Sequence, residues 1–236
     1  MSARVEGYRG GLEVSTHARR WCTLIALVLI VAACATAHDV TPEKRLQARA
    51  AYERGLSHMR DQRPSLALTA LQEAASIDTN EPLYQHTLGL LLLQLRRPDL
   101  ALERLQEATK LDPTFADAHL VTGTALAEMA RWDDAITAYR RALAQPTLAQ
   151  THIAHQNLGV ALYNLRRYRE AEESLRFAIS LEPGLESAYY NLGLVFVAEN
   201  RIDEAKAAFR QARKLAPESA FGQAALERLK ALGDGG

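Results

Sequence analysis

The chain repeats itself at an interval of 34 residues. Three small-residue positions recur in one register, separated by 34, 34, 36 and 34 residues. They are Gly55, Gly89, Gly123, Gly159 and Gly193; Ala67, Ala101, Ala135, Ala171 and Ala205; and Ala74, Ala108, Ala142, Ala178 and Ala212. A period of this length is typical of a helix-turn-helix unit, which buries its apolar face only by stacking on its neighbours. The sequence therefore predicts a row of helix pairs rather than one central core.

The composition agrees with a helical chain. Only 6% of the 236 residues are aromatic, and Ala, Leu, Glu, Arg and Gln dominate past residue 40. The 28 basic and 28 acidic side chains leave no net charge, and no long run has a single sign, which argues against a nucleic-acid binder that works by neutralising phosphates. Both cysteines, Cys22 and Cys34, precede the repeats, so the repeats contain neither an internal disulfide nor a cysteine-ligated metal.

The recurring residues resemble those of tetratricopeptide repeats. Leu192-Gly193, Ala205, Phe209, Ala212 and Pro217 fit that family's Leu-Gly, Ala, Phe, Ala, Pro pattern. The resemblance implies an all-α fold, a right-handed α-solenoid over residues 42–232. We expect repeats at 48–81, 82–115, 116–149, 152–185 and 186–219, then a C-terminal capping helix at 220–232 and a disordered tail at 233–236.

The N-terminal segment has the features of an export signal. An apolar run at residues 21–33 follows Arg19-Arg20, which predicts a signal peptide over residues 1–33; a retained membrane span is the alternative. Val31-Ala32-Ala33-Cys34 resembles the lipobox of bacterial lipoproteins. That resemblance implies that Cys34 carries the lipid and residues 34–41 form a lipidated tether. Glu6 and Glu13 are unusual in a signal, and a later start codon near Val14 would explain them.

No motif indicates catalysis. The sequence lacks HExxH, Gly-x-Ser-x-Gly, a phosphate-binding loop and a dinucleotide fingerprint. His152 and His155 lie three residues apart on one expected helix, but two ligands are too few for a closed zinc site. We therefore expect no enzyme activity, no cofactor, no metal and no small-molecule substrate.

The resemblance implies a concave groove lined by the first helix of every pair, at repeat positions 2, 5, 9 and 12. We expect a protein partner there, bound through an amphipathic helix or an extended apolar segment. In the alternative interpretation these side chains bury one another, or are covered by the tether or the capping helix. The candidate groove residues are Tyr52, Leu56, Leu83, His86, Leu90, Leu93, Leu120, Ile153, Gln156, Val160, Tyr163, Tyr190, Leu194 and Val197.

Arginine also recurs once per repeat, in the expected turn between paired helices. The five residues are Arg63, Arg97, Arg131, Arg167 and Arg201. We expect them to complement helix ends, with acidic residues such as Asp133 and Glu170 at the start of the second helices. The alternative is a ridge that contacts anionic lipid head groups.

The junction between the third and fourth repeats makes the family resemblance more specific. The 36-residue interval carries a proline-containing extension around Pro146 and an Asn157-Leu158-Gly159 segment. This resembles the type IV pilus biogenesis lipoproteins (PilF, PilW and Tgl). The resemblance implies an outer-membrane, lipid-anchored protein on the periplasmic face, which helps to localise and assemble a pilus secretin. The alternative is a periplasmic adaptor that docks a cell-wall synthase or a protease at the outer membrane.

Overall fold

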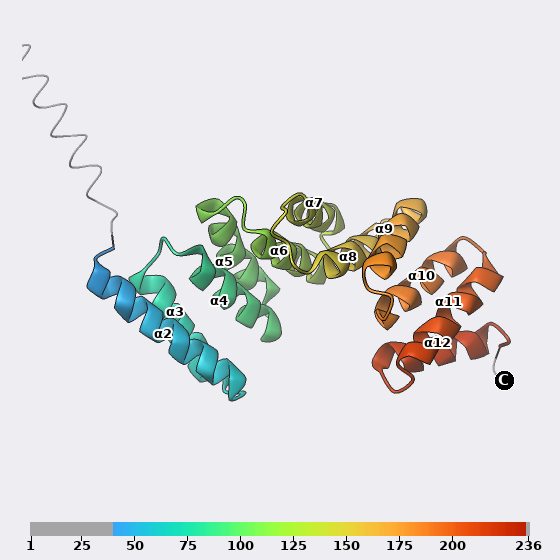
Figure 1. Ribbon diagram of the computed structural model, residues 1–236, viewed down its shortest axis with the longest axis horizontal. Coiled ribbons are helices and arrows are strands. Elements are labelled where there is room, and N and C mark those ends of the chain that lie inside the picture. Colours follow the sequence, from blue (N-terminus) through green and yellow to red (C-terminus); the bar gives the residue numbers. More distant parts are fainter. Residues whose placement is uncertain (1–39, 235–236) are drawn as a thin grey trace, which may run out of the picture. The chain divides into compact units, whose positions relative to one another are not determined.

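The computed structural model describes residues 40–234 of a chain that divides into two units, Met1–Glu43 and Lys44–Gly236. Only residues 40–43 of the first unit are described, and nearly all of the helical residues belong to the second. The described residues form eleven α-helices and no strand (Figure 1), which confirms the predicted all-α class. They are α2 (Pro42–Arg60), α3 (Pro64–Ile77), α4 (Pro82–Gln94), α5 (Pro98–Leu111), α6 (Ala116–Glu128), α7 (Trp132–Leu143), α8 (Thr151–Asn164), α9 (Tyr168–Leu181), α10 (Glu186–Ala198), α11 (Ile202–Leu215) and α12 (Ala220–Ala231).

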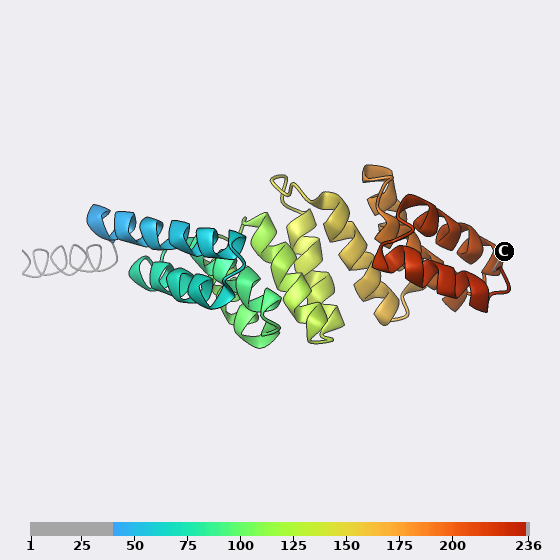
Figure 2. The ribbon, with the colours of Figure 1, turned by 90° about the horizontal axis from the view of Figure 1, so that it is seen from below.

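The helices pack in the order in which they follow along the chain. From α3 to α12 each helix contacts the next one, and α2 contacts α3 through Gly55 and Leu71. Figures 1 and 2 show the five pairs, α2/α3 to α10/α11, placed one after another. Packing between consecutive helix pairs is that of a solenoid. The row of helix pairs predicted from the 34-residue register is therefore present.

A small residue opposite a large one holds each pair together. A methyl group added to the recurring glycine of a first helix would lie 2.4 to 2.7 Å from a side-chain carbon of the second helix. The large residues are Leu71, Leu105, Tyr139, Leu175 and Phe209, and all five are buried. The recurring alanines that accompany them are fully buried too. The repeated residues are therefore structural.

The turn inside each pair has a fixed backbone shape. One non-glycine residue per turn has a φ of 55° to 60°: Gln62, Arg96, Ala130, Arg166 and Asn200. In the second repeat the Arg96 amide donates to the Leu93 carbonyl and the Arg97 amide to the Leu92 carbonyl, both at 2.9 Å. These two bonds end the first helix with a left-handed residue. The recurring arginine consequently stands at the N-cap of every second helix, from α3 to α11.

The 36-residue interval forms a longer loop, at residues 144–150. Helix α7 ends at Leu143 after 12 residues, whereas the second helices of the other repeats have 14. Leu148 is buried, and the Thr151 hydroxyl donates to its carbonyl at 2.9 Å. The longer loop is therefore attached to the core through the buried side chain of Leu148.

Helix α12 covers the end of the last repeat. Ser219 caps it by accepting from the Gly222 amide at 3.1 Å. A methyl group on Gly222 would lie 1.9 Å from the Ala216 carbonyl oxygen, so only glycine allows this approach. Ala225 and Leu229 are buried against α10 and α11. The predicted capping helix is present.

Candidate functional site

The predicted groove residues all lie on the first helix of a pair: α2, α4, α6, α8 or α10. First helices of neighbouring repeats contact each other directly, as α4 with α6, α6 with α8 and α8 with α10. Among the described residues, neighbouring second helices lie further apart than neighbouring first helices do. Because the first helices lie closer together, they form the inner side of the row. We call the surface that carries the predicted residues the inner face.

Most of the inner-face residues are half-buried. Leu83 is the most open of them, with 39% of its surface exposed. The half-buried set comprises Tyr52, Leu56, His86, Leu90, Ile153, Gln156, Val160, Tyr163, Tyr190, Leu194 and Val197. A half-buried apolar side chain rests on the fold and still presents surface to a partner. The structure therefore leaves each of these predicted residues partly open on its first helix.

The prediction is wrong for two of the groove residues, which are buried. Leu93 is 7% exposed and Leu120 is 4% exposed, and both belong to the buried core. Their helices, α4 and α6, lie side by side, so each side chain is covered by neighbouring residues. Position within the repeat does not reveal this burial, because it depends on how closely the next first helix approaches. Neither leucine is available to a partner.

Two inner-face tyrosines pack against aromatic neighbours. The Tyr52 ring lies 4.9 Å from the Tyr84 ring, and the Tyr163 ring lies 5.8 Å from the Tyr168 ring, measured between centroids. Aromatic pairs at these distances attract each other beyond the apolar area that they bury. Each tyrosine is therefore held in one orientation while part of its surface stays open.

Tyr190 is covered more fully than its position in the repeat predicts. Its ring centroid lies 5.7 Å from that of Phe209 on α11 and 5.6 Å from that of Phe221 on α12. The capping helix thus reaches the inner face at this end, since α12 also contacts α10. For Tyr190 the alternative interpretation, coverage by the capping helix, describes the structure better than an open groove.

Hydrogen bonds also join neighbouring first helices on this face. The hydroxyls of Tyr52 and Thr87 lie 3.2 Å apart, which links α2 to α4. The Ser187 hydroxyl donates to the Gln156 side-chain oxygen, which links α8 to α10. Gln156 therefore helps to set the spacing of the two helices, and its amide nitrogen is the part left for a partner.

The imidazole ring of His86 lies among the apolar residues of the inner face. Its ring centroid lies 4.9 Å from that of Phe115, and both ring nitrogens are buried with no hydrogen-bond partner among the described residues. Burial lowers the pKa of His86 below its usual range, and the nearby Asp117 carboxylate opposes this shift. The imidazole is therefore neutral at pH 7, and it can donate one hydrogen bond and accept another.

The recurring arginines bind acidic groups of the same chain in three repeats. Arg131 binds Asp134, Arg167 binds Glu170 and Arg201 binds Glu204, each three residues further on, at 2.6 to 2.9 Å. The Arg167 hydrogen bonds lower the pKa of the Glu170 carboxyl. In the first two repeats Leu66 and Leu100 replace the acid, and Arg63 and Arg97 make no ion pair within residues 40–234.

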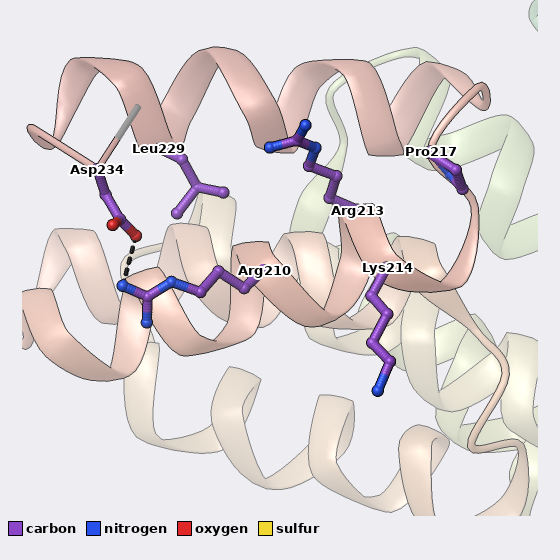
Figure 3. Close-up of a pocket in the computed structure, with 6 residues that line it drawn as sticks. All are labelled: Arg210, Arg213, Lys214, Pro217, Leu229 and Asp234. Carbon is purple, nitrogen blue, oxygen red and sulfur yellow. Dashed lines mark ion pairs between the residues drawn. The ribbon is translucent and has the colours of Figure 1, made fainter. Parts of the chain in front are cut away.

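The C-terminal end holds a basic pocket that the sequence did not predict. Its volume is about 360 Å³, and it lies between α11 and α12, lined by Arg210, Arg213, Lys214, Pro217, Leu229 and Asp234 (Figure 3). The Asp234 carboxylate binds Arg210 at 2.6 Å, and this bond lowers the pKa of Asp234. Lys214 points away from Asp234 (Figure 3). The spacing of Arg210, Arg213 and Lys214 was a usable signal, because residues three and four apart share one helix face.

Some predicted features lie outside the described residues. Cys34, the signal at residues 1–33, the tether as far as residue 39 and the tail residues 235–236 belong to that part of the chain. Among residues 40–234 no helix is long and apolar enough to cross a membrane. The same residues contain no cluster of three or more His, Cys, Asp or Glu side chains that could hold a metal ion.

The sequence profile of the tetratricopeptide repeat family matches residues 86–149 and 156–220, together more than half of the chain. This chain belongs to the tetratricopeptide repeat family. Such repeats are typically non-catalytic scaffolds for protein interaction. A curated relative, the Drosophila melanogaster protein O-mannosyl-transferase Tmtc2, is 38% identical over 85 residues. That match covers 35% of this chain, and the chain spans only 9% of that protein's length.

Solved structures of this repeat family have a similar fold. PilW, described as a widely conserved type IV pilus biogenesis factor, superimposes with a TM-score of 0.73 at 20% identity, over 79% of this chain and 86% of PilW. Pseudomonas aeruginosa PilF gives 0.70 at 18% identity, over 81% and 87% of the two chains. A MamA structure gives 0.64 at 25% identity, over 74% and 94%. At the identities of PilW and PilF the likeness concerns the fold.

Proposed function

We propose that this chain is a non-catalytic scaffold that binds a protein partner along its inner face and assists the outer-membrane localisation and assembly of a type IV pilus secretin. The observation that carries the proposal is the partly open row of apolar side chains on successive first helices, which includes Leu83, Ile153 and Val160. The fold likeness to PilW and PilF and the 36-residue junction support the choice of partner.

The chemistry of the inner face suits an apolar partner segment. Half-buried Leu, Val and Ile side chains offer contact area, and the His86 ring adds no charge within it. Arg49 is the one Lys or Arg at the predicted groove positions, so the face lacks the cluster of cations that would grip a carboxylate. An amphipathic helix or an extended apolar segment fits this surface.

The proposal also includes a lipid anchor. Cys34 ends the apolar run and stands in the Val31-Ala32-Ala33-Cys34 motif, which supports its lipidation. Several acyl chains would hold the repeats at the periplasmic face of the outer membrane without a spanning helix. Anchored in this way, the repeats would meet secretin subunits close to the membrane in which the ring forms.

The test uses a strain that lacks the chain and is complemented with variants. Val160→Glu places a charge on the half-buried inner face, and we expect it to abolish secretin multimers because an apolar contact would have to bury that charge. Leu181→Glu is the matched control, since Leu181 is an exposed leucine on the second helix α9. Equal multimer levels in the two variants would contradict the proposal.

A second outcome would favour a different partner for the inner face. If Val160→Glu leaves the secretin unaffected but releases a peptidoglycan synthase or a protease from the outer-membrane fraction, the inner face binds that enzyme instead. The chain would then be an adaptor that docks a cell-wall enzyme.

A further inference from the structure

A second concave surface lies on the opposite side of the row from the inner face. A cleft of about 430 Å³ lies between the second helices α3 and α5, with α4 as its floor. Leu68, Leu88, Leu92 and Leu100 supply its apolar lining. Leu88 and Leu92 are buried at the bottom, whereas Leu100 is 37% exposed at the edge. The cleft is large enough for apolar side chains of a bound segment.

Gln85 places an unsatisfied acceptor in this cleft. Its side chain is only 4% exposed, and its Oε1 atom is buried with no hydrogen-bond partner among the described residues. A buried acceptor without a donor costs free energy, so a ligand that supplies an N–H group here gains more than an ordinary hydrogen bond. The equivalent residue of the next repeat, His119, is satisfied, since its Nε2 lies 2.8 Å from the Pro113 carbonyl. The Gln85 oxygen without a donor therefore distinguishes the cleft between α3 and α5 from the equivalent place in the next repeat.

Arg97 adds an uncompensated positive charge at the rim. In three later repeats the corresponding arginine binds an acid three residues further on, but Leu100 takes that place here. Arg97 consequently makes no ion pair within residues 40–234. The other charged residues that line the cleft, Glu103 and Arg104, lie 3.7 Å apart and compensate each other. A bound carboxylate would complement Arg97.

We propose that the cleft between α3 and α5 is a second protein-docking site, which takes an acidic, leucine-containing segment of a partner. A leucine side chain fills the apolar floor, an N–H group of the segment donates to Gln85 Oε1, and a carboxylate of the segment binds Arg97. The site is independent of the inner face, because its lining comes from the far side of α4 and from the second helices.

The experiment measures binding of a short fluorescein-labelled peptide of alternating leucine and glutamate to the detergent-solubilised full chain. We expect Gln85→Leu and Arg97→Gln each to weaken binding about tenfold, since each removes one ligand bond. Gln85→Leu should melt no lower than wild type, because it also removes the unpaired acceptor. Arg63→Gln is the matched control and should bind as wild type, since Arg63 also stands at an N-cap without an ion pair but does not line the cleft.

Three results would overturn the proposal. The first is unchanged binding in Gln85→Leu and Arg97→Gln. The second is equal binding of a peptide in which lysine replaces glutamate. The third is a dimer of the chain that Leu100→Glu converts to monomer, because a second copy would then occupy the cleft. Val160→Glu on the inner face should leave peptide binding unchanged, so this test and that of the secretin role can fail separately.

Discussion

At the scale of single residues, the fold depends on close approach between paired helices. Each recurring glycine faces one large buried side chain, and Gly123 approaches its partner most closely, at 2.4 Å from the Tyr139 ring to an added methyl carbon. The 34-residue register made the recurring glycines and alanines visible in the sequence, but not the large side chain that each glycine faces. It could not predict the burial of Leu93 and Leu120, which depends on the distance between neighbouring repeats.

Gly123→Ala should destabilise the chain by about 1 to 3 kcal/mol, because the new methyl group overlaps a rigid ring that is itself buried. Gly184→Ala is the control: it lies in an exposed loop, and the nearest atom is a flexible Glu182 oxygen at 3.2 Å. That variant should stay within about 0.5 kcal/mol of wild type. Urea unfolding measures both, and equal stability of the two variants would show that the close approach is not required.

Tyr139 should make stability fall at alkaline pH. Burial raises the pKa of its phenol to about 12, against 10.0 for a free side chain. Because the folded pKa is the higher one, the neutral phenol stabilises the fold below pH 10, and this contribution is lost as pH rises from 10 towards 12. Comparing wild type with Tyr139→Phe isolates the effect. If both lose stability equally over this range, the phenol is not the cause.

At the scale of elements, charged groups tie successive second helices together. Glu172 on α9 binds Arg176 at 2.8 Å and also binds Arg201 at the start of α11. The repeated arginine was predicted to complement helix ends, and its bonds to acids three residues further on agree with that structural role. The link between Arg201 and Glu172, 29 residues apart, could not be predicted, because it depends on how neighbouring repeats are oriented.

Glu172→Gln should lower the free energy of unfolding by about 1 kcal/mol at pH 7, because a mostly buried carboxylate loses its charge-assisted bonds. The arginines lower the pKa of Glu172 below 4.5, so the difference from wild type should persist above that pH and vanish as pH falls through the folded pKa. Glu173→Gln, at the exposed neighbouring residue, should change little. A pH-independent loss in Glu172→Gln would assign the effect to packing instead.

Truncation of Tyr163 and of Tyr190 should show how much each ring contributes to the stability of the fold. Tyr190→Ala should cost about 3 kcal/mol or more, since its ring lies against Phe209 and Phe221 and thus joins three helices. Tyr163→Ala should cost less, because its ring packs against one aromatic ring, that of Tyr168, whereas the Tyr190 ring packs against two. Thermal melting measures both. A larger loss for Tyr163→Ala would contradict the coverage of Tyr190 by α12.

At the scale of the whole molecule, the proposed role needs both an anchor and a binding face. Cys34→Ser should leave an uncut precursor that does not fractionate with the outer membrane, because the proposed lipid attaches at this residue. Normal cleavage and normal fractionation of this variant would contradict the anchor. The repeat period and the capping helix could be predicted from the sequence, whereas the cleft at Gln85 arises only when neighbouring helices come together.

The central claim is that a protein partner binds the inner face. The most direct measurement places a photocrosslinking amino acid at Leu83 or Ile153 on that face, and at Leu181 on α9 as the control, in cells that assemble pili. We predict that crosslinks to a secretin subunit form from Leu83 and Ile153 and are absent from Leu181. Secretin crosslinks of equal yield from all three positions, or from Leu181 alone, would contradict the claim.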